Sequence, residues 1–340
     1  MNQSRSLKID AYSHVAPLKY KEALEKISPQ GAREISGSPP LYDLEHRFRL
    51  MDRHEGLLQV LAPTSPPIEV VADAKKAVEL ARLANDEIAE LVAKYPDRFV
   101  AAIAYLPLNN IDAALKEVDR AINDLGCRGI MIYSNVNGKP LDSPELQPLY
   151  EKMSGHDLPI YIHPHLPAYF PDYGTEGDTA SKFAMSSIFG RPFETTNAMT
   201  RLVFSGVLEK YPNLKIVTHH CGGMVPYYAD RITMHYGRYE AGRSQHPERT
   251  GNLNKPPVEY YRMFYNDTAL HGNTPALMCA CAFFGADRLL FAADMPRGDP
   301  QYGTQSYHLT IDAIERMDIS NADKRKIFAD NARKLLRLKI

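Results

Sequence analysis

The sequence predicts an α/β fold, a (β/α)8 barrel of the TIM type. Three observations favour it: short apolar, β-rich runs alternate with helical stretches, eight such runs can be counted, and several end in a side chain that binds metals. A chain of 340 residues is long enough for one barrel with insertions. Active sites of such barrels lie at the carboxyl ends of the strands, so the residues of the active site are expected there.

The expected strands lie near residues 6–11, 57–62, 98–105, 128–133, 158–163, 214–219, 263–267 and 288–294. The expected helices cover residues 41–54, 72–94, 111–125, 143–153, 193–210, 224–239, 274–284 and 306–317, with a terminal amphipathic helix over 321–338. No linker or repeat interrupts this order, so one domain over 1–340 is expected. Insertions near 164–195 and 242–259 are too long for plain loops and are expected to serve as lids or subunit contacts.

Composition narrows the class of partner. The chain has 40 basic and 41 acidic residues, so its charge gives no reason to expect nucleic acid or a membrane surface as the partner, and a small-molecule substrate is expected. The N-terminus shows no hydrophobic signal region and no stretch is long enough to span a bilayer, which predicts a cytoplasmic protein. A homodimer that uses the two insertions is expected, because most soluble oligomers are twofold dimers.

Residues that can bind a metal occur at the ends of three expected strands. Tyr12 and His14 stand at i and i+2 of the first strand, so both side chains point the same way. His163 ends the fifth strand and Asp294 ends the eighth. Imidazole and carboxylate groups are typical metal ligands, so these positions predict a single metal pocket. Asp294 is also a candidate base for a metal-bound water.

The sixth strand ends in two adjacent histidines, His219 and His220. On an extended chain they face opposite sides, so only one can look into the barrel. We expect this to be His220, the catalytic candidate, because it precedes the Cys221-Gly222-Gly223 turn, while His219 packs beneath it or binds a second ion. Asp267 ends the seventh strand and is expected to orient a ligand, to bind a second metal or to cap the next helix.

Tyr12 is the unusual candidate. Tyrosine ionises near pH 10, so only a strongly polarising ion such as ferric iron readily binds it as phenolate at neutral pH. The alternative is that Tyr12 only fills its position and hydrogen-bonds a bound water. Both interpretations stay open at this point.

Three further residues are candidates for substrate contact. His165 lies just past His163, and Tyr161 is a candidate wall of the pocket. Arg297 follows Met295-Pro296 and could pair with a substrate carboxylate, because a guanidinium matches the planar geometry of a carboxylate. An exposed salt bridge is the alternative role for Arg297.

The chain resembles the amidohydrolase superfamily, in particular the branch that contains aminocarboxymuconate-semialdehyde decarboxylase. The resemblance runs nearly end to end and includes the segments Ile9 to Pro17, His163-Pro164, His220-x-Gly222-Gly223-x-x-Pro226, Phe264 to Thr268, Phe284 to Phe291 and Asp294-Met295-Pro296. It implies a metal-dependent barrel of the hydrolase type with a divalent metal, normally zinc or manganese. It also implies that Tyr12, His14, His163 and Asp294 are the metal ligands and that His220 acts on substrate or water. The chain departs from the family at Tyr12, where the family has His.

The leading hypothesis is therefore a metal-dependent decarboxylase or hydrolase of a small carboxylated substrate, in which His220 and Asp294 move protons. An alternative is an iron or manganese-iron oxygenase with Tyr12 as a phenolate ligand, since hard donors favour these metals. A third hypothesis is a catalytically silent subunit that forms a heteromer with an active paralogue.

Overall fold

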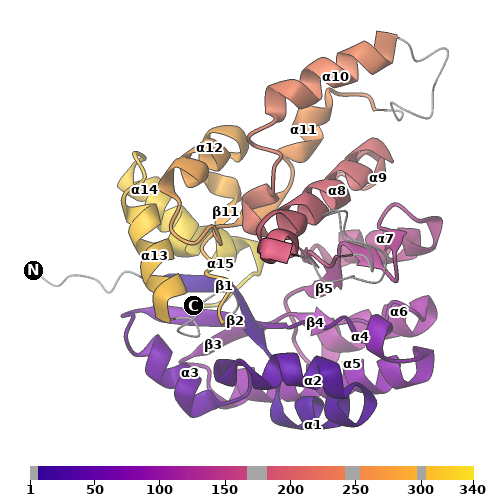
Figure 1. The fold of residues 1–340 in the computed structure, drawn as a ribbon, viewed down its shortest axis with the longest axis vertical. Coiled ribbons are helices and arrows are strands. Elements are labelled where there is room, and N and C mark those ends of the chain that lie inside the picture. The colour runs from indigo at the N-terminus through magenta and orange to yellow at the C-terminus, as the bar shows by residue number, and fades with distance from the viewer. Residues whose placement is uncertain (1–6, 167–181, 242–252, 297–303) are drawn as a thin grey trace, which may run out of the picture.

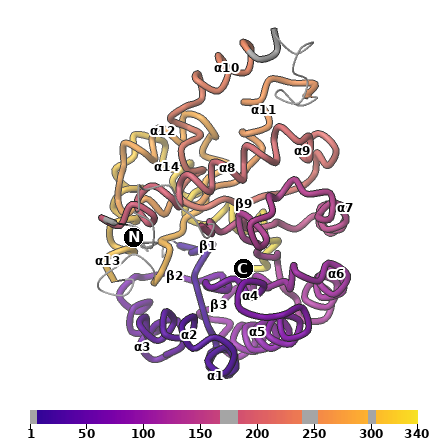
Figure 2. Tube along the Cα trace, turned by 45° about the vertical axis from the view of Figure 1, so that its right-hand side comes forward, coloured from indigo at the N-terminus to yellow at the C-terminus, as the bar shows by residue number. Residues whose placement is uncertain are grey.

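The structure is a computed structural model that describes residues 7–166, 182–241, 253–296 and 304–340. Parallel strands form a central barrel, and helices surround it (Figure 1). The predicted fold class is confirmed. Figure 2 shows that α10 reaches furthest from the barrel.

The strands are β1 (Lys8–Val15), β2 (Leu57–Pro63), β3 (Phe99–Ala102), β4 (Ala104–Tyr105), β5 (Ile130–Tyr133), β6 (Asn135–Val136), β7 (Lys139–Pro140), β8 (Ile160–His163), β9 (Ile216–Thr218), β10 (Tyr265–Asp267) and β11 (Leu289–Leu290). Two parallel sheets, β1-β2-β3 and β11-β10-β9-β8-β5-β4, make up the barrel wall. Only Ile103 separates β3 from β4, and the amide of Ala11 donates to the carbonyl of Phe291 at 2.8 Å. These two links join the sheets into the closed ring of eight strand positions that the sequence predicts.

The helices are α1 (Leu18–Ile27), α2 (Pro29–Ser36), α3 (Leu44–Met51), α4 (Ile68–Val71), α5 (Ala74–Lys94), α6 (Ile111–Asp119), α7 (Gln147–His156), α8 (Arg191–Phe204), α9 (Val207–Lys210), α10 (Ala229–Ala241), α11 (Pro257–Tyr261), α12 (Thr274–Phe284), α13 (Thr304–Glu315), α14 (Asn321–Arg325) and α15 (Asn331–Leu335). No helix of the described ranges is long and apolar enough to cross a bilayer.

Most differences from the predicted elements are at their ends. Strand β1 continues to Val15 instead of ending at residue 11, so His14 lies within the strand. The stretch 18–36 was not assigned and forms α1 and α2, which meet at Ser28, whose side chain caps α2 by accepting from the Gly31 amide. The expected helix 193–210 is split into α8 and α9 by Gly206, which has a positive φ of 79°.

The barrel interior contains a layer of large side chains beneath the strand ends. Met131, Tyr161 and Val217 are in register on β5, β8 and β9, and Tyr12 of β1 packs with them. All four are 2% exposed or less. Residues two positions further along these strands point the same way, toward the carboxyl mouth. This layer is therefore the floor on which the site stands.

A buried arginine ties α3 to the end of β1. Arg47 is fully buried, and its guanidinium donates to the carbonyl oxygens of His14 and Pro40, to Ser13 Oγ and to Gln59 Oε1. Gln59 in turn donates to the hydroxyl of Tyr307, which donates to Asp10. Burial lowers the pKa of Arg47 to about 10, so it is still charged at neutral pH. The network holds the backbone at His14.

Replacing Arg47 with Met keeps much of the side-chain volume but leaves these buried acceptors without a donor. We expect the free energy of unfolding to fall by about 3–5 kcal/mol, the range for breaking a buried charged network. Arg49→Met is the matched control on the same helix, because Arg49 is 62% exposed and its partner Glu45 is 89% exposed. That control should cost about 0.5 kcal/mol or less in the same denaturant titration. Equal losses in the two variants would contradict the structural role of Arg47.

Candidate metal centre

Three imidazoles converge at the carboxyl mouth of the barrel. His14, His163 and His219 each offer a ring nitrogen, and these nitrogens all lie within 4.8 Å of one another. The ring centroids of His163 and His219 are 4.7 Å apart, and those of His14 and His163 are 5.1 Å apart. None of the three is more than 5% exposed. Strands β1, β8 and β9 thus bring together residues that are up to 205 positions apart in the sequence.

Each imidazole ring is positioned by a contact to its outer nitrogen, Nδ1, which points away from the other two rings. His14 Nδ1 lies 2.8 Å from the carbonyl oxygen of Pro63, and His163 Nδ1 lies 2.9 Å from that of Pro164. His219 Nδ1 lies 2.7 Å from Asp267 Oδ2. Because a carbonyl oxygen only accepts, the Nδ1 atoms of His14 and His163 carry the proton and their Nε2 atoms present a lone pair. The contact of His219 Nδ1 with Asp267 is close but lacks hydrogen-bond geometry. His219 Nε2 is buried without a hydrogen-bond partner. This arrangement is typical of metal-binding histidines.

Asp294 completes the cluster. Its Oδ1 lies 3.1 Å from His14 Nε2, and the residue is 9% exposed. Burial alone would raise the pKa of Asp294, but the hydrogen bond and charge of His14, with His219 and His220, lower it below its ordinary value. Burial lowers the pKa of His14, and Asp294 only partly opposes this. Asp294 is therefore a carboxylate, and its Oδ1 shares a hydrogen bond with the His14 ring.

His14 Nε2 and Asp294 Oδ1 are close enough to share either a proton or a metal ion. A proton on His14 Nε2 would give a charged imidazolium, which burial disfavours, because Nδ1 must keep its own proton for Pro63. A metal ion fits the distance: bonds of about 2.1 Å place two donors of one ion roughly 3 Å apart. Three imidazole nitrogens and a carboxylate fit zinc or manganese. Burial also lowers the pKa of His163 well below its ordinary value, which keeps the donor neutral.

The expectation that His220, and not His219, faces the pocket is wrong. His219, expected to pack beneath, turns its ring to His14 and His163, whereas His220 lies beside it with ring centroids 5.5 Å apart. The sequence argument assumed an extended chain, but β9 ends at Thr218, and His220 and Cys221 have positive φ angles of 52° and 54°. Burial lowers the pKa of His220 to about 4, so this imidazole is neutral as well.

Two glycines make this turn. Gly222 has a φ of 76°, and a Cβ there would lie 2.7 Å from Phe284 Cζ. Gly223 has a φ of 61°, and its Cβ would lie 2.5 Å from the carbonyl oxygen of Pro192. Only glycine combines these backbone angles with this close packing. Asp267 Oδ1 accepts from the Cys221 amide, so the same carboxylate holds the turn and the His219 ring.

Tyr12 does not present its oxygen to the cluster. Its hydroxyl lies 2.6 Å from Met131 Sδ in the floor layer, and burial raises its pKa well above 10. Its ring packs edge-on against His219, with centroids 3.9 Å apart. The phenolate interpretation is therefore not what the structure shows. Tyr12 stands two residues below His14 on β1, where its phenol is neutral and supports the imidazole rings.

The other expected substrate residues differ in position. Tyr161 is fully buried in the floor with its ring 5.2 Å from Tyr12, so it cannot line an accessible pocket as expected. His165 is half-buried at the mouth, with its ring 5.8 Å from that of Tyr133. Asp267 orients His219 and is 1% exposed. Arg297 lies outside the described residues.

Sequence reasoning missed two groups at the mouth. Tyr133 ends β5 next to His163, with ring centroids 5.4 Å apart, and its hydroxyl is 2.9 Å from that of Tyr105. Its position at a strand end, in register with His163, was the available signal. The second group is Arg191, which begins α8. The Arg191-Pro192 pair marks the start of a helix inside the stretch treated as an insertion.

Comparisons with known proteins agree with this geometry. A sequence model of the family described as Amidohydrolase matches residues 9–338. The gamma-resorcylate decarboxylase of Polaromonas sp. strain JS666 is 33% identical over 301 residues, which cover 86% of this chain and 87% of that protein. The 2-amino-3-carboxymuconate-6-semialdehyde decarboxylase of Dictyostelium discoideum is 29% identical over 313 residues, which cover 86% and 82%.

A solved structure is similar over nearly the whole chain. It is the 5-carboxyvanillate decarboxylase of Novosphingobium aromaticivorans in complex with manganese and 4-hydroxy-3-methoxy-5-nitrobenzoic acid. The two chains superpose with a TM-score of 0.82 at 28% identity, covering 99% of this chain and 97% of that one.

Replacing Tyr12 with Phe tests whether its oxygen binds the metal. Because the hydroxyl contacts Met131, we expect metal affinity to stay unchanged and stability to fall by about 1 kcal/mol, the net value of one hydrogen bond. Chelator competition measures the affinity, and His163→Ala is the control that should lose metal. A large loss of affinity in Tyr12→Phe, or a visible charge-transfer band of the iron-loaded protein that this change abolishes, would restore Tyr12 as a ligand.

Proposed function

This chain belongs to the amidohydrolase family, and from that premise we propose that it is a metal-dependent decarboxylase of a small hydroxylated aromatic carboxylate. The family model spans nearly all of the chain, which supports one barrel domain over 1–340. The curated relatives with the resorcylate and carboxymuconate names are decarboxylases. The substrates in their names support the proposal that the substrate of this chain is an aromatic or unsaturated acid.

The comparisons confirm the coarser expectations. The chain is a metal-dependent carboxy-lyase or hydrolase of the amidohydrolase superfamily that acts on a small carboxylated substrate, and its cofactor is a divalent metal. They do not support the oxygenase alternative. The expectation of a silent subunit finds no support in the site, because four donor groups converge there. The cytoplasmic location stays a prediction.

One observation carries the metal assignment: His14, His163 and His219 present ring nitrogens within 4.8 Å of one another, and Asp294 Oδ1 lies 3.1 Å from His14 Nε2. We assign His14, His163, His219 and Asp294 as the groups that would hold the metal. When bound, the ion supplies positive charge that orients the substrate's carboxylate and its neighbouring hydroxyl oxygen.

The chain's own residues handle the proton. In decarboxylation the bond between the ring carbon and the carboxylate breaks, its electron pair stays on the ring carbon, CO2 leaves, and one proton must reach that carbon. We assign the relay of this proton from solvent to the ring carbon to His220, which is neutral at rest and lies beside the cluster with its Nδ1 buried and without a hydrogen-bond partner. Asp294 acts on the charge of His220 and assists the transfer. The half-buried His165 and the ring of Tyr133 lie near the mouth, where they would contact the substrate.

We also propose that the protein is a homodimer. Eight of the eleven large apolar side chains that are exposed in the described residues lie in two neighbouring segments; we call these eight the α8–α10 patch: Phe183, Ile188, Phe189, Phe193, Met224, Tyr227, Tyr228 and Met234. Exposed apolar surface concentrated in one region is typical of a protein interface. Four of the eight residues belong to the expected contact segment 164–195, and residues 167–181 and 242–252 of the two expected segments lie outside the described residues.

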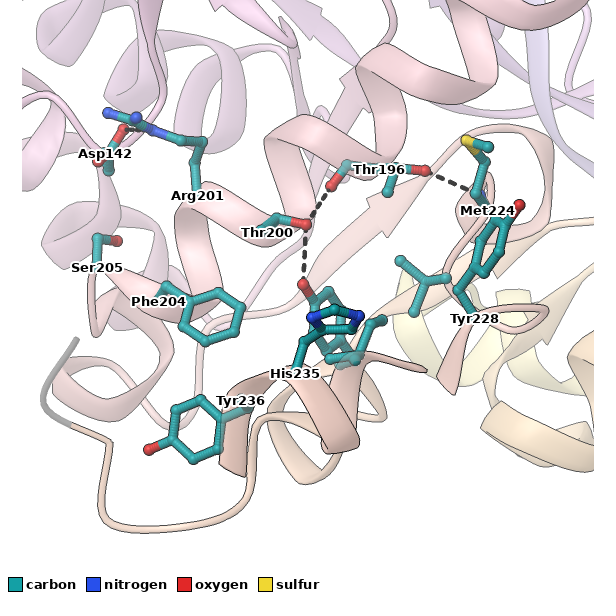
Figure 3. A pocket seen from close by; sticks show the side chains of 13 residues that line it. Asp142, Thr196, Thr200, Arg201, Phe204, Ser205, Met224, Tyr228, His235 and Tyr236 are labelled. Atoms are coloured by element: carbon teal, nitrogen blue, oxygen red, sulfur yellow. Dashed lines mark hydrogen bonds and ion pairs between the residues drawn. The ribbon is translucent and has the colours of Figure 1, made fainter. Parts of the chain in front are cut away.

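A pocket of about 600 Å³ opens between α8 and α10, next to the patch (Figure 3). Phe204 and Tyr236 form one side of it, and the hydroxyl of Tyr261 donates to Thr200 Oγ1 at its base. Helix α10 projects away from the barrel, so the outer side of this pocket lacks cover from the described barrel (Figure 1). A second copy of the chain would bury both surfaces about a twofold axis.

The function is tested by release of CO2 from hydroxybenzoates. We expect the manganese- or zinc-loaded protein to convert a hydroxybenzoate to the corresponding phenol and CO2, and the metal-free protein to be inactive. Product analysis by chromatography, with CO2 trapping, measures both. Hydrolysis of an ester or amide substrate without CO2 release from any aromatic acid would contradict the decarboxylase proposal.

Two variants separate metal binding from proton transfer. His219→Asn should lower metal content, because it removes a donor. His220→Asn should keep the metal and lower turnover by about a hundredfold or more, the usual scale for a lost general acid or base. Metal analysis and turnover are read on the same samples. If His219→Asn keeps full metal content, His219 is not a ligand.

The dimer is tested by placing a charge in the patch. Met234 is 75% exposed, so Met234→Glu should leave the fold intact and shift sedimentation at micromolar concentration from dimer to monomer. Leu18→Glu is the matched control, because Leu18 is 54% exposed on α1, outside the patch. A wild-type monomer, or an equal effect of both changes, would argue against this interface.

A further inference from the structure

The turn after β9, which carries His220, has a backbone that depends on support from other elements. His220, Cys221, Gly222 and Gly223 have consecutive positive φ angles of 52°, 54°, 76° and 61°. Glycine adopts such angles readily, but the Cβ atoms of His220 and Cys221 crowd the following carbonyl oxygen in this left-handed region. Backbone of this kind persists only where surrounding contacts fix it.

Asp267 supplies one such contact from within the barrel. Its Oδ1 accepts from the Cys221 amide at 3.1 Å, and its Oδ2 lies 2.7 Å from His219 Nδ1. The next amide, that of Gly222, donates only within the turn, to the carbonyl oxygen of His219 at 3.3 Å. Asp267 therefore supports the beginning of the turn, next to the proposed metal ligand His219.

Thr196 of α8 holds the end of the same turn from the outside. Its Oγ1 accepts from the Met224 amide at 2.8 Å and donates to the carbonyl oxygen of Pro192 at 2.8 Å (Figure 3). A Cβ on Gly223 would lie 2.7 Å from Thr196 Oγ1, so helix and turn are in direct contact. One hydroxyl thus uses its proton on the helix and its lone pair on the turn.

Helix α8 is itself anchored to the other side of the barrel mouth. Ser134, which follows β5, donates to Glu194 Oε2 at 3.2 Å and accepts from the His165 amide at 3.0 Å. Glu194 is 6% exposed, so this anchor is buried. The start of α8 is therefore fixed to the carboxyl ends of β5 and β8 and gives Thr196 a rigid mount.

We propose that Thr196 is a positioning residue for His220: its hydroxyl fixes the turn that determines where the His220 imidazole stands. The inference rests on the proposed function for the task of His220, the relay of the proton. The two supports divide the turn between them. Asp267 serves the metal ligand His219, and Thr196 serves His220, so loss of the Thr196 hydroxyl should loosen the turn without releasing the metal.

The thiol of Cys221 reports on the turn, because it is 2% exposed and directly follows His220. Thr196→Val keeps the β-branched shape but leaves the Met224 amide without its acceptor. In the manganese-loaded protein we expect N-ethylmaleimide to label Cys221 about fivefold or more faster, the effect of one lost hydrogen bond on local opening. Peptide mass spectrometry measures the rate. Thr196→Ser, which retains the hydroxyl, should keep the wild-type rate.

Two controls separate a loosened turn from a general loss of stability. Cys127 is 1% exposed and lies outside the turn, so its labelling should not change in Thr196→Val. Thr200→Val changes the next turn of α8, where the hydroxyl accepts from Tyr261 at 2.8 Å and donates to the Thr196 carbonyl oxygen at 2.7 Å. It should leave the labelling of both thiols unchanged. Equal acceleration at Cys221 and Cys127 in Thr196→Val, or none at Cys221, would overturn the proposal.

Turnover of a hydroxybenzoate tests the effect on His220. Thr196→Val should lower kcat about tenfold, less than the loss expected on removing His220 itself, with KM and metal content unchanged. Thr196→Ser should restore kcat. Faster Cys221 labelling with an unchanged kcat, or with loss of the metal, would show that Thr196 does not position His220. If the wild type releases no CO2 from any hydroxybenzoate, the proposed function fails, while the labelling rates still decide whether Thr196 holds the turn.

Discussion

The site depends on the close contacts that the outer nitrogens of three buried imidazoles make with oxygen atoms. A buried imidazole without a partner loses its hydration and gains nothing, so its ring needs an acceptor on the outer side. Pro63, Pro164 and Asp267 supply those acceptors, two of them as backbone carbonyls at strand ends. Because the backbone there is fixed by the barrel, the inner nitrogens are fixed as well. Metal binding then needs little rearrangement, which is the usual benefit of support behind a ligand.

This support extends below the rings. The Arg47 network holds the carbonyl of His14, and the floor layer holds Tyr12 against His219. Tyrosine at position 12 therefore does not interrupt the site. Strand β1 contributes one imidazole, and the turn after β9 contributes His219, so the cluster still contains three imidazoles. A neutral phenol hydrogen-bonded to a thioether fits the apolar floor better than a phenolate would.

Much of the fold and part of the site could be predicted from the sequence. Alternating strand and helix patterns are local, and parallel strands necessarily bring their carboxyl ends together, so His14, His163 and Asp294 were expected as neighbours. The choice between His219 and His220 could not be made, because the left-handed backbone of the turn depends on packing of Gly222 against Phe284, 62 positions away. The direction of the Tyr12 hydroxyl depends on Met131, 119 positions away. Contacts of this kind have no local signal.

The distribution of charge in the site could not be predicted from the sequence either. The net charge of −1 describes the whole chain and says nothing about the mouth of the barrel, where a few groups decide what can bind. There, burial keeps several imidazoles neutral, Asp294 faces the position assigned to the metal, and Arg191 adds a positive charge. Each group is ordinary alone. Their sum depends on the packing of α8 against two strand ends and a glycine turn, so the local field, like the ring orientations, follows from tertiary structure.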